Sequence, residues 1–495
     1  MVLNSTKYDV VVVGAGNAAL NAALAAHNEG AKVLVLEWAP QELRGGNTYF
    51  TSGAYRVSYG NAKEVIPKLI PDITKAEMDS CVIPPYTQDN YYNTVMRLCK
   101  GRSDPDLLEL IVRKSLPTIL WMKEQGVKWE LNMTLTKKSN DKILFAANGL
   151  VFQTKGAGAG LSDTLFDILR QRDIEVLYGN KATNLLVDGA GKVCGVGLRT
   201  AGEYQEVKGK AVVLGCGGFE SSPEMRAKYL GKDWDIVKVR GTRFNTGDML
   251  NAALNIGAAP TGHFAACHNT FVDANAPQPA IRKDTESTRR IFHTLCILVN
   301  NQGKRFVDEG EDLIVYTYAR AGIWALSQPD AIAYQIFDSK VIHLLEGFYS
   351  IPQASQVESN SIRGLEEELG LPSNSLVETV NKYNEGVQED IPFNPIVLDG
   401  KKSVIEPVKS NWAQKLDSPP YLAYPVTCGI TFTFGGLKIN LKGQVLDATG
   451  EVIPGLYACG EIVGGILYYN YPGAGGLTNG AVLGRIAGSY AASGG

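Results

Sequence analysis

Long apolar runs and a surplus of one charge are both missing from this sequence of 495 residues. No run reaches the roughly 18–20 apolar residues that span a bilayer, so we expect no membrane span. The start of the chain lacks the basic region and cleavage site of a secretory signal, which favours a cytoplasmic location. The formal net charge is −3, and this balance predicts no basic surface for nucleic acid or an anionic membrane.

Cysteine and histidine are sparse as well. The eight cysteines are scattered without a CxxC pair, and the five histidines form no cluster with zinc-ligand spacing. We therefore expect no metal site and no disulfide framework. Because no CxxCH occurs, we also expect no built-in haem to carry electrons.

The N-terminus contains a complete strand–helix–strand unit. Residues 8–13 are a continuous β-branched run, as in a strand buried on both faces. A helix of small residues follows and ends near Gly30, and residues 31–36 predict the next buried strand.

The turn between this strand and helix has the pattern of a dinucleotide site. Gly14, Gly16 and Ala19 fit G-x-G-x-x-G/A, in which the glycines allow a tight turn and the approach of a pyrophosphate. The start of the helix would offer N–H donors to the phosphates. Glu37 ends the second strand, 37 − 14 = 23 residues after Gly14, and can accept hydrogen bonds from ribose hydroxyls.

NAD would suit this unit equally well, but two other segments favour the longer cofactor FAD. The polar loop 44–48 follows Glu37 closely and can run beside a pyrophosphate. A second glycine turn with a carboxylate, Gly460-Glu461, lies near the C-terminus and can approach a ribityl chain. A cofactor contacted by both ends of the chain is a long one.

The middle of the chain differs in composition from both ends. From about residue 270 to 412 charge increases and glycine-rich strand turns disappear. We predict an α/β fold with a discontinuous Rossmann-like FAD-binding domain of the GR2 type, residues 1–269 and 413–495. An inserted α+β capping domain, residues 270–412, would hold substrate. Before the insertion, residues 104–126 predict an amphipathic helix that is interrupted at Pro117.

Several motifs resemble the flavoprotein subunits of the fumarate reductase/succinate dehydrogenase superfamily. They include GGNT at 45–48, NTGDML at 245–250, VNNQGKRFVDEGED at 299–312 and GLYACGEIVGG at 455–465. A closer resemblance, to the tricarballylate dehydrogenase-like branch, rests on YTYAR at 316–320, ITFTFGGL at 430–437 and the segment 468–488.

The resemblance implies an FAD-dependent oxidoreductase. Members with covalent flavin carry a histidine in the loop after the GG pair, and this chain has none there, which implies non-covalent FAD. Besides Gly14, Gly16, Glu37, Gly460 and Glu461, the expected FAD contacts are Asn17, Ala18, Trp38, Gly45, Gly46, Asn47, Thr48, Ser52, Gly53, Ala182, Gly217, Gly218, Asn245, Asp248, Gly475, Gly476 and Leu477.

The substrate side departs from the fumarate reductases. The family's carboxylate-binding histidine is absent from the segment 431–434, and Tyr471 replaces its arginine, which argues against a simple C4 dicarboxylate. The segment 471–475, YPGAG, is similar to one in 3-ketosteroid dehydrogenases. That similarity implies that the Tyr471 hydroxyl and a glycine N–H polarise a substrate oxygen. An equally open alternative is that this segment is a turn that only places backbone beside the flavin.

Two histidines and one carboxylate are further candidates. The family resemblance implies that His268 helps to bind a substrate carboxylate, and His293 is a second candidate. Glu309 lies in the family's RF-x-[ND]-E pattern and could relay protons, with Arg305 orienting it. The alternative role for Arg305 is a structural salt bridge. The alternative for each histidine is a hydrogen-bonded position in the core.

Tyr316 and Arg320 are four residues apart and would share a helix face, with Tyr318 pointing elsewhere. Such a pair could serve as an acid/base group, and a solvated helix face is the other interpretation.

The sequence therefore predicts hydride transfer between FAD and a C–C bond next to a carbonyl or carboxylate of a small molecule. A flavin oxidase that uses oxygen, or a non-redox flavin-dependent isomerase, remains the alternative. Electrons would pass to oxygen or to a separate acceptor.

Overall fold

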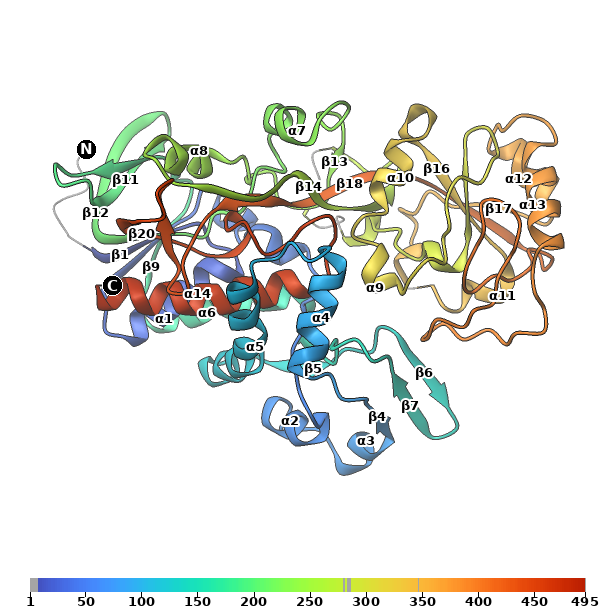
Figure 1. Cartoon of the computed structure of the whole chain (residues 1–495), viewed down its shortest axis with the longest axis horizontal. Coiled ribbons are helices and arrows are strands. Elements are labelled where there is room, and N and C mark those ends of the chain that lie inside the picture. The colour runs from blue at the N-terminus through green and yellow to red at the C-terminus, as the bar shows by residue number, and fades with distance from the viewer. Residues whose placement is uncertain (1–7, 279–280, 283–285, 346, 495) are drawn as a thin grey trace.

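The computed structural model describes residues 8–494 except 279–280, 283–285 and 346. Two sheets lie toward opposite ends of the longest axis, with the N-terminal strands at one end and α12 (Ile362–Glu368) and α13 (Ser375–Glu385) at the other (Figure 1). The predicted α/β class with an α+β insertion is confirmed by this arrangement.

The first sheet is built on five parallel strands in the order β9–β2–β1–β12–β20. Their bounds are Glu175–Leu177, Val33–Leu36, Tyr8–Val13, Glu203–Leu214 and Val452–Ala458. An antiparallel extension of β10 (Lys181–Val187) and β11 (Val193–Thr200) joins the first half of β12, and β19 (Gln444–Leu446) pairs with β20. The apolar run at the N-terminus forms the centre of this sheet because both of its faces are covered.

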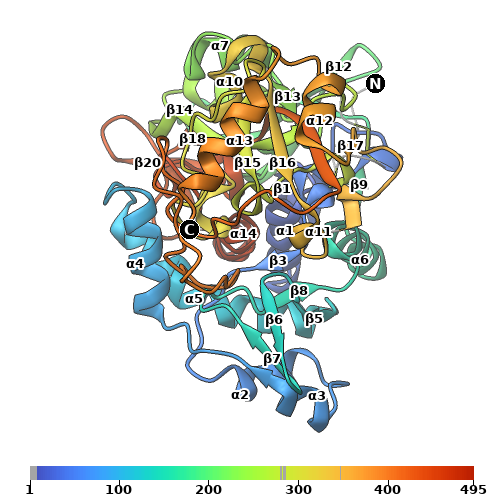
Figure 2. The same cartoon turned by 90° about the vertical axis from the view of Figure 1, so that its right-hand side faces the viewer.

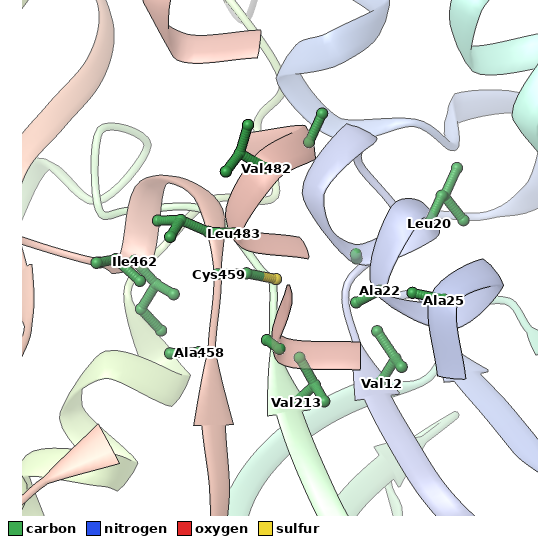
Figure 3. Packing of buried hydrophobic residues seen from close by; sticks show 14 of the residues in the cluster. Val12, Leu20, Ala22, Ala25, Val213, Ala458, Cys459, Ile462, Val482 and Leu483 are labelled. Atoms are coloured by element: carbon green, nitrogen blue, oxygen red, sulfur yellow. The ribbon is translucent and has the colours of Figure 1, made fainter. Parts of the chain in front are cut away.

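Two helices, α1 (Asn17–Asn28) and α14 (Gly475–Ser493), pack side by side against this sheet. Their contact depends on glycine, since a Cβ at Gly484 or Gly488 would collide with the carbonyl group of Ala18 or Ala22. Figure 3 shows the core that forms where these helices meet β1, β12 and β20. The close approach brings the starts of both helices to the same edge of the sheet.

The second sheet has the order β13–β18–β16–β15, with β14 and β17 also paired to β18. In chain order its strands are β13 (Lys238–Val239), β14 (Pro260–Asp273), β15 (Ile297–Asn300), β16 (Ala333–Phe337), β17 (Val357–Ser359) and β18 (Tyr421–Leu437). The long antiparallel ladder of β14 and β18 runs from Pro260 opposite Leu437 to Asp273 opposite Val426, and it links the two ends of the molecule (Figure 1). The predicted domain boundary at residues 269–270 falls inside β14.

A separate lobe lies below both sheets in Figures 1 and 2. It contains α2 (Ala62–Leu69), α3 (Lys75–Ser80), α4 (Gln88–Leu98), α5 (Pro105–Gln125), β4 (Cys81–Val82), β6 (Thr136–Ser139) and β7 (Lys142–Phe145). The predicted interruption at Pro117 is wrong, because α5 continues through it. Burial of Ile111, Ile119 and Met122 on one face offsets the lost backbone hydrogen bond, which costs about 3 kcal/mol.

The remaining short elements connect these parts. They are β3 (Ala54–Tyr55), β5 (Trp129–Leu131), β8 (Phe152–Thr154), α6 (Ala157–Gln171), α7 (Pro223–Leu230), α8 (Asp248–Asn255), α9 (Ile314–Thr317), α10 (Gly322–Leu326) and α11 (Ser339–Ile342). In the described part of the chain, none of the helices combines the length and apolarity required for a membrane crossing. The same residues contain no cluster of three side chains suited to a metal ion.

Candidate functional site

A large cavity lies where the carboxyl ends of β1, β2 and β12 meet the start of α14 and the middle of β18. Its atom-free space, which includes open solvent at the mouth, amounts to about 1840 Å³. The edge at the carboxyl ends of parallel strands is where open α/β sheets bind their ligands.

One end of the cavity is suited to a pyrophosphate. Gly16 precedes α1 without a side-chain cap, and Gly16, Asn17 and Ala18 line the cavity, so the positive end of the helix dipole lies beside this space. Gly14 has φ +98°, and a Cβ there would lie 2.6 Å from the carbonyl oxygen of Gly215. The neighbouring loop is attached to the helix start, since Asn17 N donates to Thr48 Oγ1 at 2.8 Å.

The start of α14 adds a second uncapped helix end. Ala474 precedes it with φ +64° and no side-chain cap, and Gly476 and Leu477 of its first turn line the cavity. Asn17 Nδ2 donates to Leu477 O at 2.8 Å, which joins the two helix starts. Two positive dipole ends therefore face one anionic ligand.

Glu37 lies beyond the end of β2 in the wall of the same cavity. Its Oε1 accepts a hydrogen bond from Ala39 N at 2.7 Å, and its side chain is otherwise surrounded by backbone. Burial raises the pKa of Glu37 to about 7, and backbone N–H groups partly offset this effect. Ribose hydroxyls would add further donors to this carboxylate at the cavity wall, so the position fits a dinucleotide.

Most of the expected FAD contacts lie in this cavity wall. They are Gly14, Gly16, Asn17, Ala18, Glu37, Trp38, Gly46, Asn47, Thr48, Ser52, Ala182, Gly217, Gly218, Asn245, Asp248, Gly460, Glu461, Gly476 and Leu477. Gly45, Gly53 and Gly475 do not line it. Gly45 lies in a turn that packs on Ser162. Gly53 lies in a turn that packs on Thr154 and Ala157. The N–H of Gly475 is bonded to Pro472 O.

Another part of the cavity wall gathers aromatic side chains from four segments that are distant in the sequence. The His268 ring centroid lies 5.1 Å from that of Tyr318, 5.2 Å from that of Phe432 and 5.0 Å from that of Tyr471. His268 is 2% exposed, and its Nδ1 has no hydrogen-bond partner among the described residues. Burial, with a smaller contribution from the Arg240 charge, lowers the pKa of His268 well below its usual range, so the ring is neutral.

Tyr471 is held in a defined orientation. Its hydroxyl oxygen accepts a hydrogen bond from Gly476 N at 3.1 Å, and the Tyr318 side chain is hydrogen-bonded to it. Burial raises the pKa of both phenols, so each stays protonated near neutral pH and remains a donor. The Tyr471 O–H therefore remains available to a ligand, whereas the Gly476 N–H is directed at Tyr471 itself.

Two arginines in this wall were missed by the sequence analysis. Arg240 follows β13 and donates to Thr431 Oγ1 at 3.3 Å, and Arg289 follows a short 3-10 turn at 286–288. No motif marks either position, because both reach the cavity through the pairing of neighbouring segments with β18 and β14. Tyr318 was expected to point elsewhere, yet it lines the cavity.

Glu309 and His293 lie away from this wall. Glu309 is buried and accepts hydrogen bonds from Leu298 N at 2.8 Å and from Arg305 Nη2 at 2.6 Å. His293 is also buried, with Nδ1 2.8 Å from Ile291 O and Nε2 3.0 Å from Thr317 Oγ1. Burial lowers the pKa of His293 to about 3. These contacts match the structural alternatives for both residues.

Tyr316 and Arg320 share a side of the chain, as expected, but they line a second cavity. Arg97 lies over the Tyr316 ring at 5.1 Å, and Arg320 pairs with Glu311. Neither residue contacts the large cavity.

Comparison with known proteins agrees with this geometry. The sequence pattern of the family described as FAD binding domain matches residues 9–477. A fumarate reductase (cytochrome) of Shewanella frigidimarina is 28% identical, over 98% of this chain and 77% of that protein. A vinyl phenol reductase of Lactiplantibacillus plantarum is 27% identical, over 93% of this chain and 90% of that protein.

A solved structure gives the same result at the level of the fold. The open conformation of a flavocytochrome c3 fumarate reductase matches with a TM-score of 0.75 and 25% identity, over 99% of this chain and 78% of that one. The chain therefore belongs to the FAD binding domain family, and it is an FAD-dependent oxidoreductase of the fumarate reductase/succinate dehydrogenase flavoprotein superfamily.

Proposed function

We propose that this enzyme dehydrogenates, or in reverse reduces, a C–C bond next to a carboxylate or carbonyl of a small molecule. The observation that carries the proposal is one continuous cavity whose wall holds both the two helix starts, which suit FAD, and His268, Tyr318 and Tyr471. Bound FAD, which we expect to be non-covalent, supplies hydride acceptance or donation. The names of the fumarate and vinyl phenol reductases support a C–C bond as the reacting group.

In this proposal, Tyr471 binds a substrate oxygen and Gly476 supports it. The Gly476 N–H donates to the Tyr471 hydroxyl oxygen at 3.1 Å, which leaves the phenol O–H to donate to one carbonyl or carboxylate oxygen. Charge that develops on this oxygen as an adjacent C–H bond weakens would be stabilised by this buried donor. Neutral His268 can accept a proton at Nδ1, which has no partner among the described residues.

The two arginines favour an anionic substrate. Arg240 is 7% exposed, and its charge contributes, after burial, to the lowered pKa of His268, which places a guanidinium group near the aromatic cluster. Arg289 adds a second cation in the same wall. A carboxylate is the ligand that buried guanidinium groups bind best. This charge supports the branch suggested by the sequence, that of tricarballylate dehydrogenase-like enzymes, more than a neutral substrate.

The electron partner and location complete the proposal. All eight cysteines are free and no haem motif occurs, so electrons would pass to oxygen or to a separate acceptor in the cytoplasm.

Anaerobic spectroscopy of the FAD-loaded enzyme tests the reaction. We expect one of tricarballylate, succinate or a saturated ketone to remove the visible band of oxidised flavin. If all three fail, the flavin is reduced chemically and the unsaturated partners are added. Reoxidation by one of them supports ene-reduction, and isomerisation of a substrate with no change of the flavin in either direction overturns the redox proposal in favour of the isomerase.

Arg240→Met tests the charge of the substrate. For a carboxylate substrate we expect KM to rise at least about tenfold, equivalent to about 1.4 kcal/mol of lost binding, with a smaller change in kcat. Arg243→Met is the matched control, because Arg243 lies three residues away, is exposed and does not line the cavity. An unchanged KM in Arg240→Met contradicts the assignment of Arg240 to substrate.

A further inference from the structure

Two carboxyl groups meet beside the FAD cavity. Glu461 lies in the 3-10 turn Gly460–Ile462 after β20 and borders the cavity, so part of its surface faces space that FAD would fill. Glu220 follows the glycine turn after β12 and is 0% exposed. The substrate chemistry proposed above uses neither residue.

The contacts of the pair leave one carboxyl oxygen without an ordinary donor. Glu220 Oε1 accepts from Asn47 Nδ2 and Asn245 Nδ2, each at 2.7 Å. Glu461 Oε1 accepts from Thr433 N at 2.8 Å. Glu220 Oε2 is buried and has no hydrogen-bond donor among the described residues, and the neighbouring Glu461 side chain is hydrogen-bonded to the Glu220 carboxyl group. Since two ionised carboxylates can only accept, a hydrogen bond between them requires a proton on one.

The backbone closes over this pair. A Cβ at Gly218 would collide with the Glu461 carboxyl and the Thr433 hydroxyl, so this turn lies directly on both side chains. Isolation from water disfavours a second negative charge at this place.

The surroundings offer one cation, Arg226, to the pair, which is not enough to balance two negative charges. Burial, followed by the charge of Glu220 and the hydrogen bond to it, raises the pKa of Glu461 well above its usual range, and burial also raises that of Glu220. The charged or titratable groups that face the pair from neighbouring elements are Arg226 of α7, Cys267 of β14 and Cys216 after β12. Burial raises the pKa of both thiols, to about 12 for Cys216, so neither titrates near neutral pH.

We propose that Glu220 and Glu461 hold one proton between them and act as positioning residues for FAD. The hydrogen-bonded pair joins three segments that shape the cavity, through Asn47, Asn245 and Thr433. It also presents one negative charge instead of two to a cofactor whose pyrophosphate is itself anionic. Aspartyl dyads that share a proton follow the same physics.

Urea unfolding of the FAD-loaded enzyme from pH 5.5 to 8 tests the proton. In this range both carboxyl groups have lost their protons in the unfolded chain, while the folded wild type keeps one proton on the pair. The ratio of folded to unfolded wild type therefore falls as pH rises, by up to about tenfold per pH unit. Glu461→Gln can donate its amide to Glu220 without titrating. The ratio of wild-type to Glu461→Gln folding constants should therefore fall by about tenfold per pH unit, and groups common to both, including Glu37, cancel.

FAD affinity tests the positioning role. We expect Glu461→Gln to bind FAD within about threefold of wild type at pH 7, because it keeps the hydrogen bond and removes a charge. Glu461→Leu should bind at least tenfold more weakly, since it leaves the Glu220 oxygen unpaired. Glu220→Gln provides a second variant and should abolish the same pH slope.

Either of two results overturns the proposal. Equal pH slopes in wild type and Glu461→Gln would mean that both carboxyl groups are ionised in the folded enzyme. Equal FAD affinity in Glu461→Gln and Glu461→Leu would mean that the hydrogen bond does not position the cofactor. Neither readout uses substrate, so failure here is separate from failure of the proposed reaction.

Discussion

Replacing Gly484 with alanine should force α1 and α14 apart and weaken FAD binding. A Cβ at this position would lie 3.1 Å from the carbonyl carbon of Ala18 and closer still to its oxygen. The obstacle is backbone within α1, so no side chain can rotate to make room. The two helix starts that face the cavity would then move relative to one another.

Two opposing effects set the magnitude. Glycine to alanine in an exposed helix interior stabilises by about 1 kcal/mol. Overpacking a close contact costs about 1–3 kcal/mol, and a rigid backbone contact belongs at the upper end. We therefore expect the free energy of unfolding to fall by about 2 kcal/mol.

Urea unfolding, followed by tryptophan fluorescence with and without added FAD, measures this change. The loss should be larger with FAD present, because the displaced helix starts bind the cofactor less well. Ser493→Ala, at the exposed end of the same helix, serves as the control and should change the midpoint little. A higher or unchanged urea midpoint in Gly484→Ala would refute the close packing of the helices.

Two further substitutions separate catalytic from structural roles. Tyr471→Phe should lower kcat by about 10²–10³-fold, the usual effect of removing one oxyanion donor, while the flavin spectrum and urea midpoint stay near wild type. An unchanged kcat would show that this segment supplies backbone only. Glu309→Gln should lower the free energy of unfolding by about 3 kcal/mol, because it leaves the Arg305 charge buried and unpaired, with little effect on kcat per folded enzyme. A large fall in kcat at constant stability would instead support Glu309 as a proton relay.

Local patterns predicted the cofactor end of the site well. The strand at residues 8–13, the glycine turn and Glu37 all lie within one short strand–helix–strand unit, so their geometry follows from neighbouring residues. The prediction that the helix is interrupted at Pro117 was wrong, because burial of the surrounding helix outweighed the tendency of proline to break a helix.

The substrate end depended on contacts between distant segments. His293 and Glu309 lie in conspicuous motifs, yet their polar atoms are satisfied by Thr317, Ile291, Leu298 and Arg305 inside the second part of the molecule. A motif shows which residue types are present, and only the fold shows whether their polar atoms remain available. For this reason sequence motifs predicted the cofactor-binding residues better than the substrate-binding residues.

By itself, the sequence determined the α/β class and the dinucleotide turn, because these depend on strand periodicity and on spacing within short units. The choice of FAD over NAD came from polar segments near both ends of the chain and from the family resemblance. Only the tertiary structure decided that Arg240, Arg289 and Tyr318 join His268 and Tyr471, and that Glu220 meets Glu461. These residues are brought together by the register of β14 on β18 and by the parallel pairing of β12 with β20. Such long-range pairing is set by the packing of whole sheets and leaves no periodic signal in the chain.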